Sequence, residues 1–265
     1  MIQAGALAAA PLIAEQAAEL IDCNMHFGPH PTRALPTIDE VFLERQGVTE
    51  AWVGSFEALL HRDIAGVNSR TARHCAGSRR LRAVGSLHPG LPSWKDDLRR
   101  CAEQHGMQVL RLYPNHHGYT LADPLFCEVL EACVEARLAV QVVAQMEDAR
   151  TQSPLMQLPA VDLKPLAKAM EKVPEVRLMV LNANATMITT SLRGCSRAWI
   201  DIAMIEGVAG VENILRSWPE AQVCFGSHAP FFYWEASSLK MKESILSTSQ
   251  SNAVKAANAR QWLLG

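Results

Sequence analysis

Asp22, Asn24 and His26 alternate along the apolar run Leu20-Ile-Asp-Cys-Asn-Met-His-Phe-Gly28, the stretch whose residue types best suit chemistry. Alternate residues of a strand project to the same side, so Asn24 and His26 should point together from the end of one strand. Imidazole is the commonest metal ligand and a frequent general base. An asparagine amide binds metals far less well. The spacing therefore predicts a polar site that looks like a metal site with one ligand missing.

Length and charge limit what the chain can be. Its 265 residues suit one α/β barrel of about 250 residues better than two domains. The formal net charge of −2 gives no electrostatic footprint for nucleic acid or for an anionic membrane. No apolar run approaches the ~18 residues that a membrane span needs. We therefore expect a small-molecule substrate as the partner, with no nucleic acid and no membrane.

The cysteines and the first residues bear on localisation. Seven cysteines form no CxxC pair, and Cys23, Cys127, Cys133 and Cys224 lie in apolar runs, which is typical of reduced core residues in a cytoplasmic protein. Residues 1–18 are rich in alanine and contain no Lys or Arg, whereas a signal peptide begins with basic residues. We expect a short N-terminal helix there, with secretion as the alternative.

Short apolar runs alternate with amphipathic segments along the whole chain. Continuous Val, Ile, Leu and Ala runs are typical of parallel strands that are covered on both faces. The expected strands span 19–25, 50–54, 81–87, 107–113, 138–144, 176–181, 197–204 and 221–226. The expected helices span 38–46, 64–77, 94–105, 125–136, 161–172 and 208–218. Ser93 and Asp123-Pro124 are suitable helix starts.

Eight such repeats favour a (β/α)8 TIM barrel over a doubly wound sheet. A doubly wound fold would usually show a glycine-rich turn after its first strand, and nothing in the chain matches GxGxxG or a P-loop. The sequence shows no linker or low-complexity tract. We therefore predict one barrel domain over residues 19–265, preceded by the helical extension at 1–18.

Polar residues gather at the expected carboxyl ends of the strands, where active sites of such barrels lie. The substrate-binding candidates are Asn24, His30, His88, Arg111, Tyr113, His116, Gln145, Asp148, Arg150, Asn182 and Asn184. His26 and His228 are the catalytic candidates, since each follows an apolar strand. Ser55 lacks a GxSxG elbow, so a serine triad is not expected.

Several of these candidates have a structural alternative. Arg111 lies between two leucines, and a buried guanidinium needs anionic or carbonyl partners. These partners are either a substrate anion or an internal ion pair with Glu147 or Asp148. Tyr113 and His116 could instead cap the next helix.

The segments after the fifth, sixth and eighth strands also allow two interpretations. Residues 145–150 could form a loop tied together by its own hydrogen bonds. Asn182 and Asn184 should share one face of an extended segment, so that at least one faces the pocket. Of the four aromatic residues at 231–234, one or two suit a pocket wall or an oligomer contact.

Five motifs, in this order, resemble those of the amidohydrolase-related TIM-barrel family (amidohydrolase 2 type). They are Ile21-Asp-Cys-Asn-Met-His-Phe-Gly28, Leu87-His-Pro-Gly90, Leu110-Arg-Leu-Tyr-Pro114 with Leu121-Ala-Asp-Pro-Leu-Phe126, Phe225-Gly-Ser-His-Ala-Pro230, and Ala257-Asn-Ala-Arg-Gln-Trp-Leu-Leu264. The resemblance covers almost the whole chain and implies the barrel fold. It also makes a homodimer reasonable.

The resemblance implies a divalent metal, but this chain departs from the ligand set. Members of the family generally use two strand-1 histidines, a strand-5 histidine and a strand-8 aspartate. Here Asn24 replaces the first histidine, His228 stands where the aspartate is expected, and 140–145 contains no histidine. We expect either no metal or one divalent ion, most suitably zinc. His26 and His228 would then be its ligands, with a carboxylate from Glu147 or Asp148.

Three functions follow from these residues and from the resemblance. The first is an amidohydrolase-like hydrolase of a small carboxylated lactone, amide or ester, with His228 as base and Arg111 holding the substrate anion. Related barrels hydrolyse lactones without a metal. The second is a metal-assisted decarboxylase of an aromatic acid, an activity that the family also contains. The third is a barrel that has lost catalysis and binds a ligand.

Overall fold

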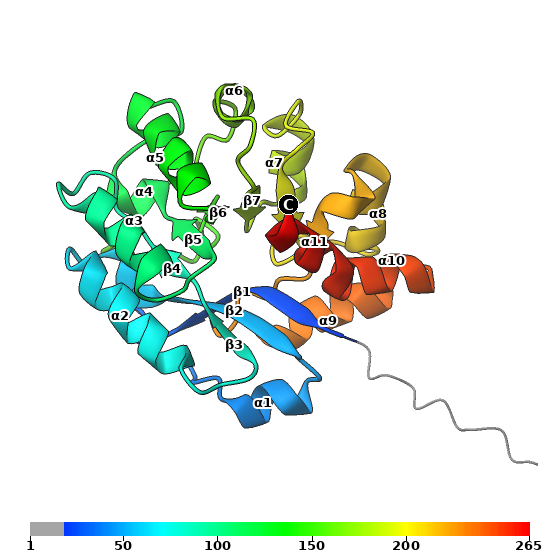
Figure 1. Ribbon diagram of the computed structural model, residues 1–265. Coiled ribbons are helices and arrows are strands. Elements are labelled where there is room, and N and C mark those ends of the chain that lie inside the picture. Colours follow the sequence, from blue (N-terminus) through cyan, green and yellow to red (C-terminus); the bar gives the residue numbers. More distant parts are fainter. Residues whose placement is uncertain (1–18) are drawn as a thin grey trace, which may run out of the picture.

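The computed structural model describes residues 19–265, which form a (β/α)8 barrel of parallel strands with helices on the outside (Figure 1). The expected helical extension at 1–18 lies outside the described residues. The strands are β1 (Ile21–Phe27), β2 (Glu50–Ser55), β3 (Leu81–Ala83), β4 (Gly85–Ser86), β5 (Val109–Leu112), β6 (Ala139–Val143), β7 (Leu178–Leu181), β8 (Trp199–Asp201) and β9 (Val223–Cys224).

The strands form two parallel sheets, β1-β2-β3 and β4 through β9, which backbone contacts join into a ring. β3 and β4 are one strand interrupted at Val84, whose N–H donates to the carbonyl of Val53 in β2 (2.9 Å). On the other side, the Cys23 N–H donates to the Phe225 carbonyl (3.0 Å), and Met25 bridges Ala229. The eight expected strands are therefore present, one of them split.

The helices follow the strands along the chain. They are α1 (Glu40–Arg45), α2 (Ile64–Cys75), α3 (Trp94–Glu103), α4 (Pro114–His117), α5 (Pro124–Glu135), α6 (Leu166–Lys172), α7 (Ala185–Thr190), α8 (Gly210–Ser217), α9 (Trp234–Glu243), α10 (Thr248–Asn252) and α11 (Asn258–Leu264). Short 3₁₀ turns lie at Phe56–Leu59 and Glu220–Gln222, and a π turn at Ala253–Ala257 joins α10 to α11. Within residues 19–265 we find no helix of the length and apolarity that crossing a membrane requires.

Some expected boundaries were wrong for physical reasons. β1 extends to Phe27, so His26 lies inside the strand and not beyond it. The helix expected at 161–172 begins only at Leu166, because the Val161 N–H donates to the Ala144 carbonyl (2.8 Å) and holds that stretch against the end of β6. The strand expected at 197–204 shrinks to three residues. Helices α4, α7 and those after β9 were not anticipated.

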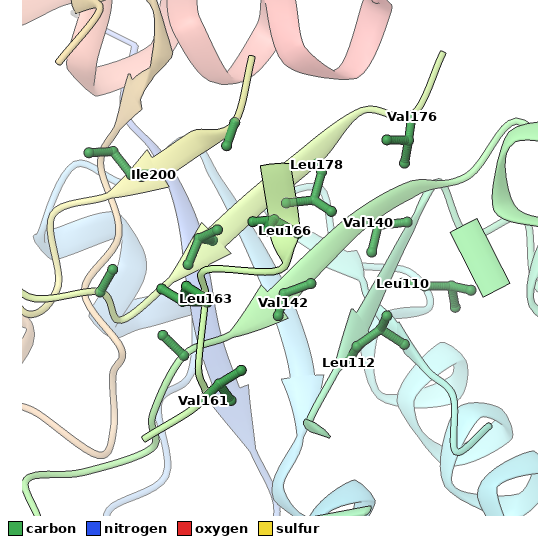
Figure 2. Packing of buried hydrophobic residues seen from close by; sticks show 14 of the residues in the cluster. Leu110, Leu112, Val140, Val142, Val161, Leu163, Leu166, Val176, Leu178 and Ile200 are labelled. Atoms are coloured by element: carbon green, nitrogen blue, oxygen red, sulfur yellow. The ribbon is translucent and has the colours of Figure 1, made fainter. Parts of the chain in front are cut away.

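Alternation along β5 and β6 separates the core into an outer and an inner layer. Figure 2 shows Leu110, Leu112, Val140 and Val142 in the outer cluster, together with Leu166 of α6. Their neighbours in sequence point the other way, into the barrel, with Met179 of β7. Arg111 and Gln141 belong to this inner face, so the barrel interior is polar where these two strands approach their ends. All seven cysteines are free thiols, and only Cys127 is partly exposed.

Asp22 ties β1 to the segment that follows β9. Its Oδ1 accepts hydrogen bonds from the backbone N–H groups of Asn24 (3.1 Å) and Ser227 (3.0 Å), and its Oδ2 accepts one from Trp234 Nε1 (3.0 Å). Burial raises the pKa of this carboxyl to about 7, although the donors oppose the rise. These contacts give Asp22 a structural role at the closure of the barrel.

Trp234→Phe removes one donor from this buried carboxylate, and we expect it to lower the free energy of unfolding by about 1–3 kcal/mol. Trp218→Phe is the matched control, because the Trp218 Nε1 is buried without a hydrogen-bond partner among residues 19–265. Urea unfolding of both variants measures the difference. Equal losses would contradict a stabilising role for the Trp234–Asp22 hydrogen bond.

Candidate functional site

Arg111 lies inside the barrel, fully buried, and is held by neutral groups. Its Nε donates to Gln141 Oε1 (2.9 Å) and its Nη1 to the Met25 carbonyl (2.9 Å). Its Nη2 donates to the carbonyls of Cys23 (3.3 Å) and Trp52 (3.4 Å). Within the described part of the chain no carboxylate lies within 4.0 Å of the guanidinium, so the internal ion pair with Glu147 or Asp148 is absent. Backbone carbonyls satisfy this cation.

His26 faces the guanidinium. Its Nε2 lies 3.0 Å from Arg111 Nη1 and 3.2 Å from the Tyr113 hydroxyl, and its ring stacks on Phe56 at 4.7 Å between centroids. A guanidinium can only donate, so Nε2 must act as an acceptor and the ring must be neutral. Burial, reinforced by the Arg111 charge, holds the pKa of His26 well below its usual value.

His228 approaches His26 edge-on, with ring centroids 5.2 Å apart. Its Nε2 donates to the Met146 carbonyl (2.7 Å), and its Nδ1 accepts from Asn182 Nδ2 (3.4 Å). Both ring nitrogens are therefore engaged. Burial lowers the pKa of His228 to about 3. The backbone φ of +58° is uncommon for a histidine and turns the side chain into the barrel.

Asn24 connects two further residues of the network. Its Nδ2 donates to Asn182 Oδ1 and to Asp201 Oδ2, both at 2.7 Å. Asp201 also accepts from the Asn182 N–H (2.8 Å), and its burial raises the pKa of its carboxyl. Asp201 was not among the sequence-predicted site residues, because the strand was expected to continue past it. An acid inside the apolar run Trp199-Ile-Asp201 was the available signal.

His30 presents a nitrogen without a partner. The Thr32 N–H donates to its Nδ1 (3.3 Å), so the proton of the neutral ring lies on Nε2. This Nε2 is buried and has no hydrogen-bond partner among the described residues. Burial lowers the pKa of His30 to about 4. Its ring lies between Phe56 (5.1 Å) and Phe231 (5.3 Å), near the other site histidines.

A narrow pocket opens over the ends of β5 and β6. Tyr113, His116, Gln145 and Glu147 are among the residues that line it. Burial lowers the pKa of His116 to about 4. An Arg33–Glu147 ion pair joins the segment after β1 to the segment after β6 across the barrel mouth. Tyr113 and His116 therefore line the pocket, as substrate binding by these residues would require. Their role in substrate binding remains a prediction.

Four other candidates lie elsewhere. Asp148 and Arg150 form an exposed ion pair with each other, which is the alternative of a loop tied by its own hydrogen bonds. Asn184 caps α7 by accepting from the Met187 N–H (2.9 Å). The expected shared face of Asn182 and Asn184 was wrong, because Asn182 takes a left-handed φ of +59°. His88 is half-buried and stacks on His117 at 4.2 Å.

These residues do not fit a divalent metal. Within residues 19–265 no group of three His, Cys, Asp or Glu side chains is placed to hold one. A metal bonded to His26 Nε2 at about 2.1 Å would sit within ~5 Å of the guanidinium, at a repulsion of roughly 7 kcal/mol for an effective dielectric constant of 20. His228 uses both nitrogens, and the carboxylates of Glu147 and Asp148 are paired with arginines.

Comparison with known proteins supports the fold. The family model described as Amidohydrolase matches residues 21–247. A 5-carboxyvanillate decarboxylase from Sphingomonas paucimobilis is 13% identical, with a TM-score of 0.72 over 93% of this chain and 99% of that chain. A 2,6-dihydroxybenzoate decarboxylase from Rhizobium is 10% identical, with a TM-score of 0.71 over 94% and 99%. No match was found among curated proteins.

A third similar structure was solved with a metal. It is a dihydroxybenzoic acid decarboxylase from Polaromonas with bound manganese and the inhibitor 2-nitroresorcinol, 11% identical, with a TM-score of 0.72 over 92% of this chain and 96% of that chain. At these identities the likeness shows the fold alone. The predicted (β/α)8 barrel and the family resemblance are thus confirmed, whereas the ligand atoms of this chain differ from those of a metal site.

The neutral His228 has a consequence for stability at low pH. Its folded pKa of about 3 lies below the usual 6.5, so the unfolded chain binds the extra proton first. Stability from the neutral ring is complete above pH 6.5 and is lost as the pH falls toward 3. We expect His228→Asn, which tolerates the left-handed φ, to flatten the fall of unfolding free energy between pH 6.5 and 4. Urea unfolding at several pH values in this range measures the effect. If the unfolding free energies of wild type and variant fell with equal slope against pH, His228 would not be the cause of the loss.

Proposed function

The chain belongs to the amidohydrolase family, whose model matches most of its length, and on that premise we propose a hydrolase that needs no divalent metal. Its substrate class is a small carboxylated lactone, amide or ester that binds at the barrel mouth. His26, His228 and Arg111 organise the site, and the free donor of His30 faces the substrate. The finding that carries the proposal is the buried Nε2–H of His30, which lacks a protein acceptor within residues 19–265.

A buried donor without an acceptor lowers stability by about 1–3 kcal/mol, so a ligand oxygen that accepts it is favoured. Attack of water on a carbonyl places negative charge on the carbonyl oxygen, and fixed donors in a water-poor site stabilise that charge. A neutral imidazole with a lowered pKa serves as such a donor, as it does in triosephosphate isomerase. Tyr113 also lines the pocket, and its hydroxyl donates to His26 Nε2, which orients the imidazole ring.

The same lowered pKa values make His26 and His228 weak bases, because basicity falls with pKa. A substrate with a reactive acyl group therefore suits the site better than an amide. Lactones and esters demand the least proton transfer before the carbon–oxygen bond breaks. We place a carboxylated lactone first among the three substrate types for this reason.

A ligand-binding barrel without catalysis is the second candidate. Both ring nitrogens of His228 are engaged, and Arg111 and Tyr113 occupy the accepting nitrogen of His26, so neither histidine has a free nitrogen to take a proton from water. The third candidate is decarboxylation of an aromatic acid, the reaction named for several structural neighbours. Its metal-assisted form finds no matching donor set in residues 19–265.

The test is a turnover assay on protein treated with a chelator, using a panel of carboxylated lactones and esters beside 2,6-dihydroxybenzoate. We expect proton release from a lactone, unchanged by the chelator. His30→Ala should lower kcat by about 10²–10³-fold, as loss of one oxyanion donor does. His30→Gln, which keeps a donor, should retain more activity, and the exposed His61→Ala should match wild type.

Two results would replace the proposal. Saturable binding of the carboxylated compounds without turnover would assign a binding protein. Release of CO₂ from the aromatic acid, present only with added manganese, would assign the decarboxylase.

A further inference from the structure

We propose that the guanidinium of Arg111 occupies the role of a divalent ion in this barrel, and that its charge keeps a metal away from His26. The inference deepens the proposed function, because it gives a physical cause for independence from metal. It concerns a residue that the sequence had assigned to a substrate anion.

Arg111 links four strands of the barrel, and its Nη1 lies 3.0 Å from His26 Nε2. From β5 it reaches the carbonyls of Cys23 and Met25 in β1 and of Trp52 in β2, and the side chain of Gln141 in β6. Gln141 also donates to the Cys23 carbonyl (2.9 Å). A planar guanidinium with five N–H donors can bind several oxygen atoms in fixed directions. It therefore performs the cross-linking that a metal performs through its ligands.

The barrel is shaped around this side chain. A Cβ atom at position 54 would lie 3.2 Å from Arg111 Nη1 and 3.5 Å from the Tyr113 hydroxyl, so the glycine leaves room for both groups. The guanidinium lies 3.0 Å from His26 Nε2 and no acid within residues 19–265 pairs with it. No salt bridge therefore offsets its positive charge at the lone pair that a metal would need.

Asn24 completes the arrangement. Its Nδ2 donates to Asp201 and Asn182, so the amide satisfies two acceptors. A histidine at this position would instead place an imidazole next to Asp201 and on the same strand as His26. Two imidazoles and one carboxylate would then be present as ligands, and only the guanidinium would oppose a metal. This difference separates the effect of the charge from the effect of the missing ligand.

The experiment measures bound metal in wild type, Asn24→His, Arg111→Met and the double variant. Each protein is incubated with Mn²⁺ or Zn²⁺, passed through a desalting column and analysed for metal. We expect about one ion per chain only in Asn24→His/Arg111→Met, and less than a tenth in the other three. Asn24→His/Arg111→Lys is the matched control, because it keeps the charge and should also stay free of metal.

The outcomes differ from those of the turnover assay. One ion bound by wild type or by Asn24→His, and lost on His26→Ala, would overturn the inference whatever the lactones do. The role of the charge would be overturned if Asn24→His/Arg111→Lys bound as much metal as Asn24→His/Arg111→Met. The wild-type and Asn24→His measurements keep Arg111 in place, so an ion bound by either would overturn the inference even where Arg111→Met fails to fold. Failure to hydrolyse lactones leaves all of these stoichiometries unchanged.

Discussion

The buried charge of Arg111 governs what surrounds it in the barrel. A cation without a neighbouring acid is stable inside a protein only when every N–H finds an oxygen or nitrogen acceptor, because desolvation is otherwise too expensive. Here three carbonyls, Gln141 and His26 supply those acceptors. His26 is in consequence a neutral acceptor, and Gly54 has no side chain. The charge of Arg111 thus keeps His26 neutral, and the room that its guanidinium needs leaves position 54 to a glycine.

Periodicity alone predicted the fold well, since parallel strands that are buried on both faces produce continuous apolar runs. The order of strands followed correctly from the alternation with amphipathic segments. Boundaries failed where tertiary contacts decide them, as at Val161, whose N–H bonds to the end of β6 and delays the next helix. Helices that follow β9 carry no strong amphipathic pattern; α9 contains serines and lysines on several sides. Sequence signals are weakest for such elements.

For the candidate site, the type of a residue predicted its membership of the site better than its place in the sequence predicted its contacts. The sequence identified His26, His228, Arg111 and Asn182, which the fold brings together, because polar residues within apolar strands are rare. It could not identify their partners, since the carbonyls of Met25 and Met146 look like those of any residue. The face of Asn182 was mistaken because a left-handed φ breaks the alternation of a strand. A local departure of the backbone from strand geometry therefore cannot be predicted from the pattern of side-chain types alone.

The ring of strands closes where β1 meets the residues after β9. The backbone hydrogen bonds there run from Cys23 to Phe225, from His26 to Ala229 and from His228 to Asn24. The seam of the barrel and its polar centre are thus built from the same stretch of chain. A change that loosens these backbone hydrogen bonds therefore disturbs the closure of the barrel and the placement of His26 and His228 together.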